Sequence, residues 1–323
     1  MQQAGAKNSR MASRRRFLSS ALALACTPIL AQDKPRVFRI GMLETVSIGA
    51  NNANLVELHK GLKELGHEEG KHYIILYRSA EGHTERFAPL AAELARQKVD
   101  VFLTRGTPAT LAARDTRSGI PVVASAIADP IDGVTGLISS VTDLGAKRME
   151  LLKALAPGVK RIGALTNPDN PASLANWKVI AAAAPAMKLQ AEMIDARKPD
   201  ELAAALETAV KNGVDAFIFG IETLTQANQA LIIDFAARRR LPAVYAARSF
   251  VEAGGLISYG VHYGNLYYRS AAFLDKVRKG VKGAELPMER PNKFELVMNR
   301  KTAHALKIVI PPDLLLRSDE IID

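Results

Sequence analysis

The stretch Arg39-Ile40-Gly41-Met42-Leu43 returns 122 residues further on as Arg161-Ile162-Gly163-Ala164-Leu165. Two other landmarks, separated by a helical pattern, return in the same order with offsets of 115 and 121 residues. They are Lys98-Val99-Asp100-Val101-Phe102 with Gly213-Val214-Asp215-Ala216-Phe217, and Ile120-Pro121-Val122-Val123 with Leu241-Pro242-Ala243-Val244. Strings this short recur by chance, but their preserved order favours a duplication and predicts two similar lobes.

Short apolar runs alternate with longer amphipathic runs from residue 37 onward. These patterns predict strands at 37–43, 73–77, 99–103, 121–126, 162–165, 189–194, 214–219, 243–245, 256–259 and 294–299. They predict helices at 55–65, 87–97, 108–116, 172–184, 200–211, 224–239 and 267–279. Because parallel strands need a crossover and a helix is the usual one, the alternation predicts an α/β fold whose lobes are open parallel sheets flanked by helices.

The length of 323 residues also suits two domains. We expect lobe 1 to comprise residues 36–155 and 265–323, and lobe 2 to comprise residues 156–264. The last segment is expected to cross back to lobe 1, because the helix at 267–279 and the strand at 294–299 follow a second sheet that is already complete.

The loops after the strands are the expected binding loops. In open parallel sheets, ligands bind beyond the carboxyl ends of the strands, and two facing lobes can close around a solute by hinge motion. The candidate loops are therefore 44–54, 104–109, 127–132, 166–171, 220–226 and 246–250.

Several of these loops lead directly into helices, whose free N–H groups and positive dipole end favour an anion. In one loop, Gly106 permits close backbone approach, and Thr107 can cap a helix that begins at Pro108. A carboxylate could bind there, although an ordinary helix start is an equal reading. Asn167 occupies the corresponding position in lobe 2, with the same two readings.

Four further side chains have the chemistry of ligand contacts. Asp129 and Glu222 could meet a ligand ammonium, although Asp129 also fits a plain turn and Glu222 could simply face water. Tyr245 and Arg248 could stack on a planar or carboxylate-bearing solute, or pack at the lobe boundary. With two hydroxyls from the first loop, the candidate ligand-binding set is Thr45, Ser47, Gly106, Thr107, Asp129, Asn167, Glu222, Tyr245 and Arg248.

Motifs for catalysis and for phosphate, dinucleotide or metal binding are missing from the sequence. It has no G-x-x-x-x-G-K-[ST], no G-x-G-x-x-G and no G-x-S-x-G. The six histidines show no metal-ligand spacing, and the single cysteine, Cys26, excludes an intrachain disulfide. We therefore expect no enzyme activity, no cofactor and no metal.

The N-terminus explains much of the net charge of +10. Arg14-Arg15-Arg16-Phe17-Leu18 precedes a short apolar run that ends near Ala31, which predicts a twin-arginine-type signal peptide over residues 1–31 and export to the periplasm. Lipid anchoring at Cys26 is the minor alternative. The five basic residues of this segment leave a net charge of only +5, so we expect no nucleic-acid partner.

Many segments together resemble the ABC transporter substrate-binding family that includes the tryptophan/tyrosine importer components. The resembling segments are 61–71, 77–82, 106–109, 129–130, 134–137, 147–152, 240–245, 248–260 and 293–299, within a match over about 38–323. The resemblance implies a two-lobed periplasmic-binding-protein (Venus-flytrap) fold, a small-molecule solute, and a permease with a separate ATPase as partners.

The resemblance does not extend to the expected signature of aromatic amino acid binders. Those proteins have a His-Pro-like segment after the first strand and an Asp-Asn pair after a lobe 2 strand, whereas this chain has Glu44-Thr45-Val46-Ser47 and Gly220-Ile221-Glu222-Thr223. Another amino acid, a carboxylate or an aromatic acid fits equally well.

These observations predict an extracytoplasmic solute-binding component of an ABC importer, monomeric and with no transmembrane segment in the mature chain. The solute is expected to be an amino acid or a carboxylate. Two alternatives remain open at this point, which are a periplasmic ligand-sensing subunit for a receptor and an enzyme on the same two-lobed fold.

Overall fold

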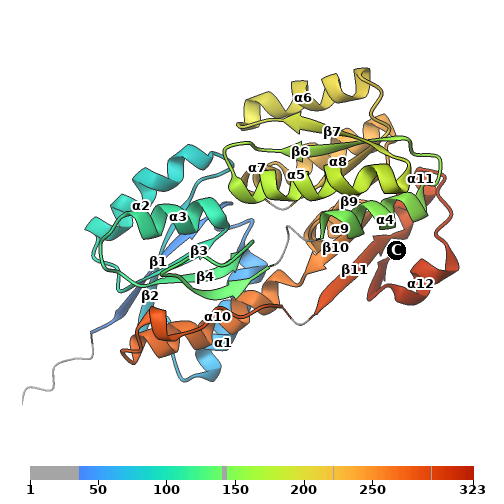
Figure 1. The fold of residues 1–323 in the computed structure, drawn as a ribbon. Helices are drawn as coiled ribbons and strands as arrows, with labels where there is room; N and C mark the ends of the chain where they lie inside the picture. The colour runs from blue at the N-terminus through green and yellow to red at the C-terminus, as the bar shows by residue number, and fades with distance from the viewer. Residues whose placement is uncertain (1–35, 140–143, 221, 292) are drawn as a thin grey trace, which may run out of the picture. The chain divides into compact units, whose positions relative to one another are not determined.

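Two sheets carry the fold, the first entirely parallel and the second parallel except for its last two strands, at 294–299 and 320–322 (Figure 1). The computed structural model describes residues 36–139, 144–220, 222–291 and 293–323, so the expected signal peptide lies outside the described residues. The α/β fold class predicted from the alternation of strands and helices is confirmed.

The first sheet has five parallel strands in the order β2-β1-β3-β4-β5. They are β1 (Phe38–Glu44), β2 (Tyr73–Ser79), β3 (Val101–Arg105), β4 (Val122–Ile127) and β5 (Thr135–Ile138). Its flanking helices are α1 (Asn52–Glu64), α2 (Phe87–Arg96), α3 (Thr107–Asp115) and α10 (Tyr263–Arg278). We call this sheet with its helices lobe 1.

The second sheet repeats the same strand order and adds two strands at one edge, giving β7-β6-β8-β9-β10-β11-β12. The strands are β6 (Arg161–Thr166), β7 (Gln190–Asp195), β8 (Ala216–Phe219), β9 (Ala243–Tyr245), β10 (Ile257–Val261), β11 (Phe294–Asn299) and β12 (Glu320–Ile322). The helices are α4 (Gly145–Leu155), α5 (Pro171–Ala183), α6 (Pro199–Lys211), α7 (Thr223–Ala227), α8 (Gln229–Arg239), α9 (Arg248–Glu252), α11 (Arg300–Ala305) and α12 (Pro312–Arg317). We call this group lobe 2.

The repeated sequence landmarks make the same contacts in the two lobes. Asp100 accepts a hydrogen bond from the backbone N of Arg39 at 2.7 Å, and Asp215 accepts one from the backbone N of Arg161 at 3.0 Å. In each case the aspartate's own backbone N donates back to the arginine carbonyl, at 2.8 and 2.9 Å. Within each lobe, the repeated aspartate therefore binds the start of the first strand in the same way, which supports two related lobes.

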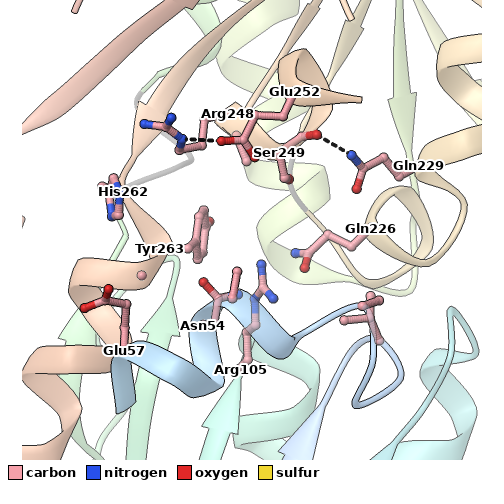
Figure 2. Close-up of a pocket in the computed structure, with 15 residues that line it drawn as sticks. Asn54, Glu57, Arg105, Gln226, Gln229, Arg248, Ser249, Glu252, His262 and Tyr263 are labelled. Carbon is pink, nitrogen blue, oxygen red and sulfur yellow. Dashed lines mark hydrogen bonds and ion pairs between the residues drawn. The ribbon is translucent and has the colours of Figure 1, made fainter. Parts of the chain in front are cut away.

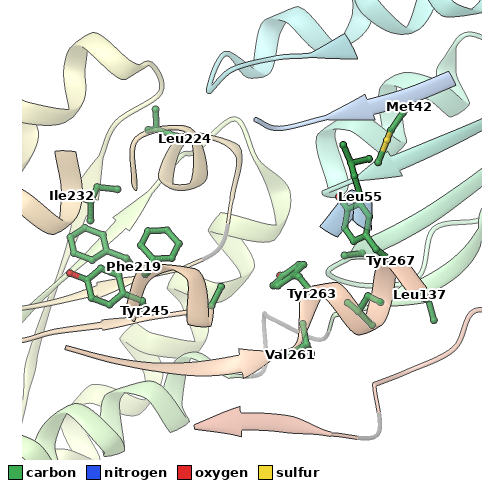
Figure 3. Packing of buried hydrophobic residues seen from close by; sticks show 14 of the residues in the cluster. Met42, Leu55, Leu137, Phe219, Leu224, Ile232, Tyr245, Val261, Tyr263 and Tyr267 are labelled. Carbon is green, nitrogen blue, oxygen red and sulfur yellow. The ribbon is translucent and has the colours of Figure 1, made fainter. Parts of the chain in front are cut away.

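Strand alternation divides the buried apolar residues between the faces of each sheet. Along β8, for example, Phe217 and Phe219 pack into one cluster while Ala216 and Ile218 pack into another. The first of these clusters runs from lobe 1 into lobe 2 and includes Tyr263 (Figure 3). The two sheets are therefore joined by packed side chains as well as by the chain itself.

The prediction that residues 265–323 return to lobe 1 is correct for α10 and wrong for β11 and β12. Helix α10 packs on α1 in lobe 1, but β11 pairs antiparallel with β10, and β12 pairs with β11, so both strands belong to the second sheet (Figure 1). The sequence could not assign β11 to a lobe, because its apolar pattern would be the same in either sheet. In the second sheet, β11 pairs with β10 and so covers an edge that would otherwise be exposed.

The predicted lobe boundary at residue 155 is also wrong, because it assigned α4 to lobe 1. It packs against α5 and against β8, β9 and β10, so it covers the second sheet. The chain thus passes between the lobes before α4, between β10 and α10, and again between Glu289 and β11. Within the described residues, no helix is long and apolar enough to cross a bilayer.

Candidate functional site

A small pocket lies between the lobes, where the ends of β1, β3 and β4 face the starts of α5 and α7. Its volume is about 30 Å³, two to three times the ~10–15 Å³ that a cavity needs to hold one water molecule. We call it the inner chamber. Lobe 1 lines it with Thr45, Arg105, Gly106, Thr107, Pro108, Ala126, Ala128 and Ser139, lobe 2 with Asn170, Ala172, Glu222, Thr223 and Gln226, and α10 with Tyr263.

Glu222 brings a buried carboxyl group to the chamber from lobe 2. Glu222 is 6% exposed, and its carboxylate lies beside the Asn170 side chain and the first turn of α7. Neither carboxylate oxygen makes a hydrogen bond of normal geometry with the described residues. Burial raises the pKa of Glu222 to about 8, with the nearby Asn170 side chain acting in the opposite direction. A ligand cation in the chamber would favour the ionised form and would satisfy these oxygens.

Arg105 brings the opposite charge from lobe 1, as the last residue of β3. It is 6% exposed, and its guanidinium lies 4.6 Å from the ring centre of Tyr263 and donates to Asn51 Oδ1 at 3.4 Å. Its Nε has no partner among the described residues. Behind it, buried Glu44 accepts a hydrogen bond from Tyr267; burial raises the pKa of Glu44, and Arg105 opposes that rise.

The start of α3 adds hydrogen-bond donors to the same wall. Gly106 precedes the helix with φ of 86°, a left-handed conformation that favours glycine, and Pro108 lies in the first turn. The hydroxyl of Thr107 is buried and has no partner among the described residues. This end of the helix is positive, so it complements Arg105 in attracting an anionic group.

A second, larger cavity of about 390 Å³ adjoins the chamber (Figure 2). We call it the outer vestibule. Its polar lining includes Asn54 and Glu57 on α1, Gln229 on α8, Ser249 and Glu252 on α9, and His262, while Val46, Ala50, Ala53 and Ala247 supply small apolar surface. It lies within the usual range of ~300–1,000 Å³ for small-molecule sites.

Arg105, Gln226 and Tyr263 line both cavities, and we call them the neck. Figure 2 shows the Arg105 guanidinium between the side chains of the other two. The lobes meet at this level, because the Thr45 hydroxyl donates to Gln226 Oε1 at 3.1 Å. A chamber closed by contacts from both lobes is the expected site for capturing a small solute.

The comparison with protein-family models identifies the family. Residues 39–322 match the model of the ABC transporter substrate binding protein family. The chain belongs to this family. The resemblance found in the sequence is thereby confirmed, and both family and fold are those of substrate-binding proteins rather than of enzymes.

Known substrate-binding proteins of similar sequence and structure include amino acid binders. A tyrosine-binding protein of Clostridioides difficile is 23% identical over 261 residues, which are 76% of this chain and 74% of the relative. The structure of an ABC domain in complex with L-Trp from Streptococcus pneumoniae is 26% identical, with a TM-score of 0.80 over 88% of this chain and 100% of that one. A conserved domain protein from Vibrio cholerae is 25% identical over the same shares, also with a TM-score of 0.80.

The structure brings four of the predicted site residues to the inner chamber of this substrate-binding protein. Thr45, Gly106, Thr107 and Glu222 all line it. Arg248 lines the outer vestibule, but its guanidinium pairs with three carboxylates, which are Glu252 at 2.8 Å, Glu295 at 3.2 Å and Glu320 at 2.7 Å.

The other predicted site residues lie outside both cavities. Ser47 is exposed and accepts a hydrogen bond from its own loop, and Asp129 is exposed. Asn167 is buried and donates to Thr84 of lobe 1 at 3.4 Å, so it joins the lobes. The placement of Tyr245 at the site is wrong, because β9 turns this ring into the core between Phe219 and Phe250.

Arg105, Tyr263 and Gln226, which line the chamber, and Glu44 behind Arg105 are not among the predicted site residues. Glu44 and Arg105 end their strands as single charged residues after apolar runs, which is a signal that points to the loop end of the sheet. Tyr263 was outside every candidate loop, because it reaches the site from the start of α10. In the described part of the chain, no group of three His, Cys, Asp or Glu residues could hold a metal ion.

Proposed function

We propose that this chain is the extracytoplasmic solute-binding component of an ABC importer. It captures a small organic solute, an amino acid or another carboxylate, in the cleft between its lobes, and delivers the solute unchanged to a permease that works with a separate ATPase. The predicted twin-arginine-type signal would place the mature protein, as a monomer, in the periplasm.

The observation that carries this proposal is the pair of opposite, unsatisfied groups in the inner chamber. Glu222 of lobe 2 offers two buried carboxylate oxygens that make no hydrogen bond of normal geometry with the described residues. Lobe 1 offers Arg105 Nε and the Thr107 hydroxyl, which have no partner among the described residues. Leaving a buried polar group unsatisfied costs about 1–3 kcal/mol. A solute with a cationic and an anionic end, such as an amino acid, would satisfy both sides together.

Capture would proceed by hinge closure. The groups that need the solute come from different lobes, so they can surround it only when the lobes approach each other. The contacts between Thr45 and Gln226 and between Asn167 and Thr84 would form in the closed state and break on opening. The connection at His262, between β10 and α10, would form part of the hinge.

The test is a thermal-shift screen of residues 32–323 against amino acids, aromatic acids and small carboxylates. A ligand at 100 times its Kd should stabilise the protein by about 2.7 kcal/mol, and it should be recovered chemically unchanged. Glu222→Ala and Thr107→Ala should lose the shift, whereas Glu150→Ala, an exposed residue on α4, should retain it. A folded protein that gives no shift with any compound, or a ligand that is converted, would contradict the proposal.

A further inference from the structure

The inner chamber alone is too small for a whole solute. Its volume of about 30 Å³ is two to three times the ~10–15 Å³ that a cavity needs to hold one water molecule, which leaves room for a compact head group but not for a long side chain as well. The lobes already touch at Thr45–Gln226 and at Thr84–Asn167, so this volume describes lobes that are in contact. The rest of the solute must therefore lie beyond the neck, in the adjoining vestibule of about 390 Å³.

Resting on the proposed function, we infer that the solute is an α-amino acid with a long, hydrogen-bonding side chain. Its charged head lies in the inner chamber between Glu222 and Arg105, and its side chain passes the neck into the outer vestibule. The vestibule is thus a second subsite, which binds the end of the side chain and selects solutes by its chemistry.

The lining of the vestibule favours a polar side chain over an aromatic one. Asn54, Glu57, Gln229 and Ser249 present amide, carboxylate and hydroxyl groups from both lobes. Tyr263 is the one phenol, phenyl or indole ring among the described lining residues, and the Arg105 guanidinium already covers it at 4.6 Å. An aromatic side chain would find little ring surface to pack against, whereas a ureido or guanidino group would find several hydrogen-bond partners.

The test compares solutes that share the same head group. Kd values would be measured by isothermal titration calorimetry for L-alanine, L-norleucine, L-citrulline, L-arginine and L-tyrosine. L-citrulline or L-arginine should bind at least tenfold more tightly than L-alanine, L-norleucine and L-tyrosine. The inference would be overturned if neither L-citrulline nor L-arginine bound more tightly than L-norleucine, or if L-alanine or L-tyrosine bound most tightly.

Two variants locate the effect in the vestibule. Ala53→Trp on α1 and Ser249→Trp on α9 fill it from opposite lobes, and each should remove the tenfold advantage of the long polar solute. Ala88→Trp, on the exposed surface of α2, is the matched control and should retain the advantage. If the advantage survives in both vestibule variants, the side chain does not lie there and the inference is wrong.

The same data separate this inference from the proposed function. If the broad thermal-shift screen finds a different solute that is recovered unchanged, and none of the five amino acids binds, solute capture stands and the inference falls. If the folded protein binds nothing in either experiment, the proposed function itself is contradicted.

Discussion

At the scale of single residues, Glu222 makes ligand binding and protonation compete for one carboxyl group. The folded protein holds the proton of Glu222 more tightly than the unfolded chain does, because burial raises its pKa from 4.5 to about 8. Where the native state binds more protons than the unfolded state, the free energy of unfolding falls as the pH rises. This contribution to stability is therefore fully present below about pH 4.5 and is lost towards pH 8.

We predict that Glu222→Gln flattens this pH dependence in the ligand-free protein. The variant should be more stable than the wild type at pH 8, because it has no buried carboxylate to ionise, and the difference should shrink towards pH 5. Urea unfolding at several pH values measures the effect. Glu150→Gln, at an exposed position, should keep the wild-type slope. A Glu222→Gln variant with that same slope would show that burial does not control this group.

Arg248 is predicted to contribute to stability rather than to the affinity for the charged head. Its guanidinium pairs with Glu295, which is 7% exposed, and with Glu320 on β12. Arg248→Ala would leave a buried carboxylate without its cation, and we expect the free energy of unfolding to fall by about 1–3 kcal/mol.

Denaturant unfolding of Arg248→Ala and of Arg238→Ala measures this difference. Arg238 has a single exposed pair with Asp234 on the same helix, and such pairs contribute about 0.3–0.5 kcal/mol. Calorimetry with a bound amino acid whose side chain is too short to reach the vestibule should show a Kd for Arg248→Ala within threefold of wild type, because Arg248 lines the vestibule and not the inner chamber. If Arg248→Ala lost much of its affinity without losing stability, Arg248 would contact the ligand head and the prediction would be wrong.

At the scale of elements, Asp100 and Asp215 hold equivalent strand starts in the two lobes. Asp100 accepts hydrogen bonds from the backbone N–H of Arg39 and from the Arg36 guanidinium, and Asp215 accepts hydrogen bonds from the backbone N–H groups of Lys160 and Arg161. Hydrogen bonds to a charged group contribute about 1.5–3 kcal/mol. We therefore predict that Asp100→Ala and Asp215→Ala lower the free energy of unfolding by similar amounts in that range.

Chemical denaturation followed by circular dichroism measures both losses, with Asp132→Ala in an exposed loop as the control. A large effect of one aspartate and none of the other would mean that the repeated sequence no longer has a repeated structural role.

Most elements could be predicted from the sequence, because period-two and helical patterns are local properties of the chain. The assignment of β11 to a lobe could not, since Phe294–Asn299 is equally apolar whichever sheet receives it. Tyr245 shows a similar limit at the site. Ala243 and Tyr245 on one face of β9 and Val244 on the other are all buried, each face against its own cluster. The sequence alone does not show that the ring of Tyr245 packs in such a cluster instead of reaching the loop end of the sheet.

The candidate site was predictable where it depends on loops after strands, as with Thr107 and Glu222. It was not predictable where it depends on a segment that returns from the other lobe. Tyr263 lies at the start of α10, directly after the chain has left β10, and only the packing of α10 on α1 brings its ring beside Arg105.

At the scale of the whole molecule, we predict that binding makes the protein more compact. Without ligand, the unsatisfied groups of the inner chamber disfavour the closed arrangement, and a bound solute would remove that penalty. Small-angle X-ray scattering should show a smaller radius of gyration when a ligand from the screen is saturating. Glu222→Ala should show no change at the same concentration. An identical radius for wild type with and without bound ligand would contradict hinge closure.

In each sheet, the amino ends of the strands carry stabilising contacts and the carboxyl ends carry the binding site. This separation affects how such a protein could change over evolutionary time. The paired aspartates hold the strands at the amino ends, while the chamber, neck and vestibule are built at the carboxyl ends. Substitutions in the recognition loops therefore leave the anchoring contacts intact. After gene duplication, substitutions of a few loop side chains could change the solute that is bound, while the fold stays the same.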